Sequence, residues 1–181
     1  MFQQMQNKRQ PTRSSFAKQK LSGHVQNRSI AIDPGYDRMG AAVFEGSTLI
    51  HSECFEPPKG GFAERLRAIH ERVAALITEY SPSSLALETL FFSKNQTTAI
   101  KVAEARGVIE LAAAEASIPV VEYSPQAVKT AVTGSGNADK EGVKKMAMLL
   151  LKLPEKKRLD DEYDAIALGV AHTASYKSTP L

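Results

Sequence analysis

Residues 28–55, RSIAIDPGYDRMGAAVFEGSTLIHSECF, contain three apolar segments separated by turns. The first segment ends at Asp33 before the turn PGYDR, and Gly46-Ser47 separates the second from the third. Short apolar segments divided by Gly and Pro are typical of consecutive β-strands. This stretch predicts three strands, at least two of them paired as a hairpin.

Beyond this meander, predicted helices alternate with predicted strands. Apolar residues recur every three or four positions over 62–80, which predicts an amphipathic helix. SLALE at 84–88 and PVVEY at 119–123 are short apolar strands. This order predicts an α/β fold, in which helices cover a mixed sheet. Four further helices are expected at 95–116, 125–131, 139–152 and 160–176.

The composition of the 181 residues suits one globular domain, expected over 29–178, and a basic arm over 1–28. The arm holds six Lys and Arg residues and no acid, so it is expected to be disordered and attracted to polyanions. A solvated extension or an organellar targeting peptide is the alternative. Neither a membrane span nor a signal-peptide core is evident, and we expect a soluble, cytoplasmic protein with no membrane partner.

Two predicted strands each end in a carboxylate. SIAID closes at Asp33 and SLALE at Glu88. If the strands are parallel neighbours, the two acids lie side by side at the sheet edge where α/β proteins bind ligands. Two close like charges each raise the pKa of the other, and a divalent cation would relieve this repulsion.

A third segment, DDEYDAIALGVAH at 160–172, begins with acids and continues as an apolar helix. Acids in a first turn can cap the helix and favour its dipole, which accounts for Asp160, Asp161 and Glu162. Capping explains Asp164 less well, because this acid directly precedes the apolar run AIALGVA, whose residues are expected to be buried. Asp161 and Asp164 share one helical face, and spacing alone leaves a metal role and a capping role equally open.

The remaining residues narrow the kind of metal. A single cysteine, Cys54, and four scattered histidines offer no soft or imidazole-rich site. Four carboxylates therefore indicate Mg²⁺ or Mn²⁺. Two such ions could activate water for phosphodiester hydrolysis.

Several blocks of the sequence together resemble the RuvC family of Holliday-junction resolvases. They are IAIDPG, ALETLFFSKN, ARG, PVVEYSPQAVKTAVTGSGNADKEGV, LLLKLP and DEYDAIALGVAH, spread over about residues 29–176. The resemblance implies a ribonuclease-H-like fold with a five-stranded mixed sheet, a homodimer, and Mg²⁺-dependent symmetrical nicking of four-way DNA junctions. It also implies two Mg²⁺ ions per active site, for which Mn²⁺ can substitute.

The resemblance also assigns roles to individual residues. Its acidic quartet falls on Asp33, Glu88, Asp161 and Asp164, the four acids singled out above. The expected DNA-binding residues are Phe91, which probes the junction, its neighbours Phe92, Lys94 and Asn95, and two phosphate-contacting lysines, Lys129 and Lys140. The Ala-rich helix after Asn95 is expected to supply much of the dimer contact.

The sequence departs from the family pattern in its basic arm, in a slightly shortened loop near residue 57 and in the turn PGYDRMG after Asp33. Two alternative functions remain: a non-catalytic nucleic-acid-binding module, and a related nuclease acting on RNA. Recruitment of the dimer by a branch-migration helicase complex is left open. His172 is interpreted as an ordinary helix residue, and Arg158 as one of several basic residues that add positive surface charge.

Overall fold

The computed structural model describes residues 27–89, 96–154 and 157–176. Five strands form one mixed sheet in the order β3-β2-β1-β4-β5. Strand β1 pairs antiparallel with β2 and parallel with β4, so the predicted hairpins and mixed sheet are confirmed. The strands are β1 (Arg28–Asp33), β2 (Met39–Glu45), β3 (Thr48–Phe55), β4 (Ser84–Glu88) and β5 (Val120–Tyr123).

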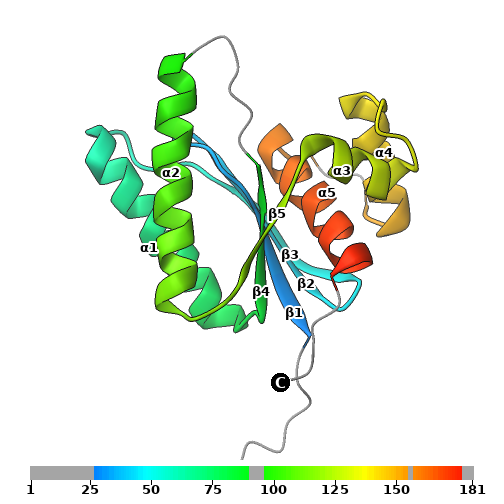
Figure 1. Ribbon diagram of the computed structural model, residues 1–181, viewed down its shortest axis with the longest axis horizontal. Helices are drawn as coiled ribbons and strands as arrows, with labels where there is room; N and C mark the ends of the chain where they lie inside the picture. Colours follow the sequence, from blue (N-terminus) through cyan, green and yellow to red (C-terminus); the bar gives the residue numbers. More distant parts are fainter. Residues whose placement is uncertain (1–26, 90–95, 155–156, 177–181) are drawn as a thin grey trace, which may run out of the picture.

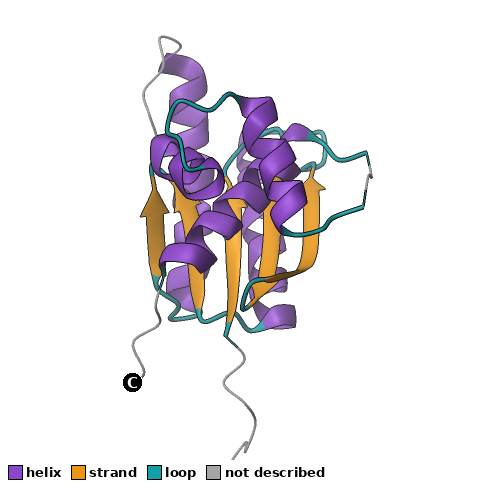
Figure 2. Ribbon diagram, turned by 90° about the vertical axis from the view of Figure 1, so that its right-hand side faces the viewer, coloured by secondary structure: helices purple, strands orange, loops and turns teal. Residues whose placement is uncertain are grey.

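Helices cover both faces of this sheet (Figures 1 and 2). Helices α1 and α2 lie on one face, and α5 crosses the other with α3 and α4 packed beside it. The helix bounds are α1 (Phe62–Tyr80), α2 (Gln96–Glu115), α3 (Pro125–Thr133), α4 (Lys140–Leu150) and α5 (Asp160–Ser175). Predicted and observed ends differ by at most two residues. Within the described ranges, no helix combines the length and the apolar character needed to cross a membrane.

The central strands separate large from small side chains. On β1, Ile30 and Ile32 enter the core beneath α1 and α2, whereas Ala31 enters the core beneath α5. On β4, Leu85 and Leu87 follow the first face and Ala86 the second. Because alternate residues of a strand point to opposite faces, the α5 face is lined by small residues there. Helix α5 can therefore lie close to the strands.

Two glycines allow α5 and β2 to approach each other closely. A Cβ on Gly40 of β2 would overlap the backbone carbonyl of Asp161, and a Cβ on Gly169 of α5 would overlap the ring of Phe44. Phe44 itself is fully buried. Both ends of the α5–β2 contact thus depend on a residue without a side chain.

Helix α2 carries apolar residues around its whole circumference. Ala105 and Ile109 are buried against the sheet, while Ile100 and Leu111 are 57% and 51% exposed. Exposed apolar side chains that gather on one helix can mark a surface that meets another protein. This agrees with the expected dimer contact without testing it.

Replacing Gly169 with alanine is expected to lower the free energy of unfolding by about 1–3 kcal/mol, because the added methyl group overlaps the buried Phe44 ring. Urea unfolding followed by circular dichroism measures the change. Gly107→Ala is the matched control on α2, where a Cβ meets nothing within 4 Å, and alanine favours the helix. An equal loss in both variants would contradict the packing argument.

Candidate active site

Asp33 and Glu88 stand at the ends of neighbouring parallel strands. Strand β1 pairs with β4 in the register Ile32↔Leu87, and the next residue on each strand is the acid. The strand alternation that turns Ala31 and Ala86 toward α5 also turns Asp33 and Glu88 to that face. The two carboxylates thus share one face of the sheet, as predicted from the sequence.

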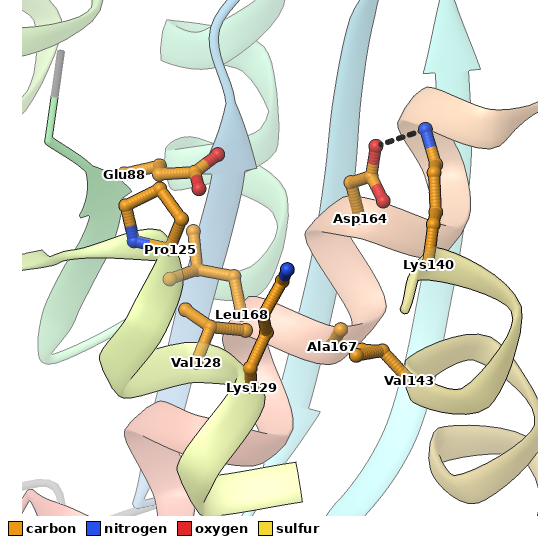
Figure 3. Close-up of a pocket in the computed structure, with 9 residues that line it drawn as sticks. All are labelled: Glu88, Pro125, Val128, Lys129, Lys140, Val143, Asp164, Ala167 and Leu168. Carbon is orange, nitrogen blue, oxygen red and sulfur yellow. Dashed lines mark ion pairs between the residues drawn. The ribbon is translucent and has the colours of Figure 1, made fainter. Parts of the chain in front are cut away.

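The N-terminus of α5 brings the other two acids to the same place. Gly40 pairs with Asp33 across β1 and β2, and the backbone of Asp161 lies directly against Gly40. One turn further, Asp164 lines the same cavity as Glu88 (Figure 3). Gly40 was not predicted to matter, although a glycine inside a strand often marks a close backbone approach.

The charges of the four acids act on one another. Burial, followed by the neighbouring charges of Asp164, Glu88 and Asp161, raises the pKa of Asp33 to about 8. Burial, followed by the charge of Asp164, also raises the pKa of Glu88. The acids are therefore close enough for their mutual repulsion to be felt, in an environment that disfavours charge.

Two basic side chains pair with the helical acids. Lys140 Nζ lies 2.9 Å from Asp164 Oδ2 and 3.6 Å from Asp160 Oδ2. Arg38 Nε lies 3.0 Å from Asp161 Oδ2. By contrast, no ion pair or hydrogen bond to the side chains of Asp33 or Glu88 is present among the described residues. Ion pairs thus compensate the helical acids, whereas the strand acids are offset only through space by the charge of Lys140, which lowers the pKa of both.

The donor chemistry of the quartet suits a hard divalent cation. All four side chains offer carboxylate oxygens, which Mg²⁺ and Mn²⁺ prefer, and the strand pair has no ion-pair partner among the described residues. In the described part of the chain, no three His, Cys, Asp or Glu side chains already converge tightly enough to hold an ion. The helical carboxylates instead contact basic side chains, Asp164 with Lys140 and Asp161 with Arg38.

The first-turn acids of α5 do not act as the predicted caps. Leu159 is the N-cap residue and makes no side-chain capping bond. Glu162 is buried, accepts a hydrogen bond of 2.7 Å from Ser52 Oγ and lies 3.2 Å from Arg158 Nε. The capping interpretation is therefore wrong for Glu162. Arg158, expected on the surface, has a side chain only 6% exposed.

A cavity of about 290 Å³ opens beside the acids (Figure 3). Glu88, Asp164, Lys129 and Lys140 line its polar part. The structure brings both predicted phosphate-contacting lysines to the quartet, Lys140 through its ion pair and Lys129 across the cavity. The cavity floor is apolar and consists of Pro125, Val128, Val143, Ala167 and Leu168.

Arg106 connects three elements near Glu88, a role that the sequence did not predict. Its side chain is 10% exposed and donates to the backbone carbonyl of Glu88 and to Glu110, and its Nη2 lies 2.6 Å from Glu122. Arg106 therefore ties the end of β4 to α2 and β5. The sequence pointed to it only as part of the block ARG, without a role.

His172 lies away from the four acids and has a structural role. It is 1% exposed, and its ring bonds to Ser84 Oγ at 2.8 Å and to Tyr123 Oη at 2.9 Å. Ser84 begins β4, whereas Glu88 ends it. Burial lowers the pKa of His172 to about 4, so the ring is neutral near pH 7. It joins α5 to the sheet at the opposite end, and it is no candidate for an active-site base.

Four predicted DNA-binding residues lie outside the described residues. They are Phe91, Phe92, Lys94 and Asn95, in the segment that joins β4 to α2. Their roles stay predictions.

Comparisons with known proteins give a consistent result. The family model described as crossover junction endodeoxyribonuclease RuvC matches residues 29–172. A protein of this description from Pseudothermotoga lettingae is 40% identical over 148 residues, which cover 79% of this chain and 91% of the relative. One from Moorella thermoacetica is 44% identical over 151 residues, covering 80% and 90%.

The solved structures agree with this match. Thermus thermophilus RuvC in complex with a Holliday junction substrate superimposes with a TM-score of 0.75 at 35% identity, covering 80% of this chain and 92% of that one. The yeast mitochondrial Holliday junction resolvase Ydc2 has a TM-score of 0.56 at 14% identity, covering 82% and 80%. The second likeness concerns the fold alone. Together they confirm the expected ribonuclease-H-like fold.

The raised pKa of Asp33 predicts a pH-dependent cost to stability. The folded chain holds this proton more tightly than the unfolded chain, so the contribution to stability is complete below pH 3.8 and is lost as pH rises toward about 8. Asp33→Asn removes the titration. Without metal it should exceed the wild type in free energy of unfolding by more than about 1 kcal/mol at about pH 8, with the gap closing toward about pH 4.

Urea unfolding in EDTA across this pH range measures the difference. Glu71→Gln, which removes one exposed acid on α1, is the control and should show no such gap. A variant Asp33→Asn that is less stable than the wild type at both ends of the range would refute the electrostatic account.

Proposed function

Because this chain belongs to the RuvC family of crossover junction endodeoxyribonucleases, and is thus a Holliday junction resolvase, we propose that Asp33, Glu88, Asp161 and Asp164 form its catalytic centre. The observation that carries the assignment is the in-register placement of Asp33 and Glu88, with the first turns of α5 against them. Four acids from three separate elements meet at the carboxyl end of the central strands. Their repulsion disfavours this arrangement unless the site binds positive charge.

The family is metal-dependent, and we assign Mg²⁺ to this quartet, two ions per site, with Mn²⁺ able to substitute. Bound divalent ions supply the Lewis acidity that activates a water molecule and stabilises the leaving 3′-oxygen. The carboxylates of Asp33 and Glu88 would hold them at the sheet, since these two lack other partners among the described residues. Asp161 and Asp164 would complete the ligand set from α5 once they release Arg38 and Lys140.

The lysines beside the quartet would orient the DNA strand. Lys129 and Lys140 line the cavity next to Glu88 and Asp164, where an ammonium group can contact a phosphate oxygen. A phosphate that engages Lys140 would also free Asp164 from its ion pair. We infer that Phe91 reads the junction itself, by stacking on or between bases, with Phe92, Lys94 and Asn95 alongside.

A homodimer suits the substrate. A four-way junction offers two equivalent strands, and paired nicks need two related active sites. The exposed apolar side chains of α2, including Ile100 and Leu111, support this helix as the contact between subunits.

Replacing each acid by its amide tests the catalytic assignment. Asp33→Asn, Glu88→Gln, Asp161→Asn and Asp164→Asn should each abolish nicking of a synthetic four-way junction in Mg²⁺ while sparing junction binding, because the amide keeps the shape but loses the charge. Gel assays of cleavage and binding, with EDTA, duplex DNA and hairpin RNA as comparisons, measure both. Retained Mg²⁺-dependent nicking in any two variants would discredit the quartet. Preferential cleavage of the RNA would favour the RNA-nuclease alternative.

Replacing the lysines tests the strand contacts. Lys129→Ala and Lys140→Ala should each weaken junction binding. Each should also reduce the slope of log affinity against log salt concentration by about 1, the contribution of one phosphate contact. Fluorescence anisotropy at several salt concentrations measures the slope. The control is Lys59→Ala, in the exposed loop before α1, which should leave the slope unchanged. A slope unaltered in both active-site variants would rule out the phosphate contacts.

A further inference from the structure

Arg38 holds one of the four acids in an ion pair of its own. It stands immediately before β2, in the turn that follows β1, and its Nε lies 3.0 Å from Asp161 Oδ2. Asp161 has a side chain 22% exposed, and that of Arg38 is 45% exposed. Across this contact Cys54 Sγ lies 3.9 Å from the same oxygen. The carboxylate oxygen that faces Arg38 is thus already in contact with donors.

The two basic side chains at the quartet differ in their surroundings. Lys140 contacts both Asp160 and Asp164 and lines the cavity that would receive the DNA strand. Among the described residues, Asp161 is the sole ion-pair partner of Arg38. Because almost half of its side chain is already exposed, Arg38 can leave Asp161 for solvent without burying a charge elsewhere.

We propose that Arg38 competes with divalent metal for Asp161 and so weakens metal binding by the free enzyme. The inference rests on the proposed role of Asp161 as a metal ligand. An ion that binds through Oδ2 of Asp161 must displace the guanidinium, because Arg38 already contacts that oxygen. The metal therefore binds at the cost of this ion pair.

The size of the effect follows from the exposure of the pair. Ion pairs near the surface contribute little to stability because water screens them. Their loss corresponds to a change in apparent affinity of about two- to five-fold. Arg38 thus sets the metal concentration at which the site fills and does not block the site.

The experiment titrates the full-length protein with Mn²⁺ in the absence of DNA and follows the electron paramagnetic resonance signal of free Mn²⁺. Arg38→Gln should lower the apparent Kd by about two- to five-fold. Arg38→Lys keeps the charge and should stay near the wild type. Arg67→Gln removes the same charge from an exposed position on α1, and should leave the Kd unchanged if the effect is local.

A double-variant cycle separates this proposal from the proposed function. In the background of Asp161→Asn, Arg38→Gln should have no effect on the Kd, because the competing carboxylate is gone. If the wild type binds Mn²⁺ and Arg38→Gln binds it with the same Kd, the role of Arg38 is overturned and the quartet stands. The same holds if Arg67→Gln changes the Kd as much as Arg38→Gln does. If Mn²⁺ does not bind, or if its binding does not depend on Asp33 and Glu88, both the role of Arg38 and the proposed metal site are overturned.

Discussion

The close approach of α5 to the sheet is the contact on which the rest of the structure depends. The small side chains of Ala31 and Ala86 let α5 pack close to the central strands, and Gly40 leaves room for the backbone of Asp161. Gly169 does the same for the Phe44 ring further along α5. With larger side chains at these positions the helix would stand away from the strands, and the helical acids would lose their place beside Asp33. Packing and chemistry are therefore set by the same small residues.

This approach creates an electrostatic conflict that the basic side chains of the protein resolve only in part. Arg38 and Lys140 pair with the helical acids, while burial and then the charge of Asp164 raise the pKa of both Asp33 and Glu88. Perturbed carboxylates grouped in this way are typical of sites that use their charge. The side chains that cost stability through their charge are thus Asp33 and Glu88, at the ends of β1 and β4.

The sequence predicted the elements and the adjacent placement of Asp33 and Glu88 well because both depend on local patterns, while the catalytic role of the quartet stays a prediction. Alternation along β1 and β4 and the three-residue spacing of Asp161 and Asp164 are visible in one dimension. Contacts between distant segments were not visible. The burial of Glu162 depends on Ser52 and Arg158, and the role of Gly40 depends on which strand lies beneath α5. The pairing of Arg38 with Asp161 was missed for the same reason.

The position of Arg106 has a consequence for how two subunits could act together. This residue belongs to α2, the helix with the exposed apolar side chains, and it donates to the backbone carbonyl of Glu88. A displacement of α2 on subunit association would be passed through one buried guanidinium to the end of β4. If α2 forms the proposed subunit contact, assembly and the geometry of the proposed catalytic centre would then be mechanically linked.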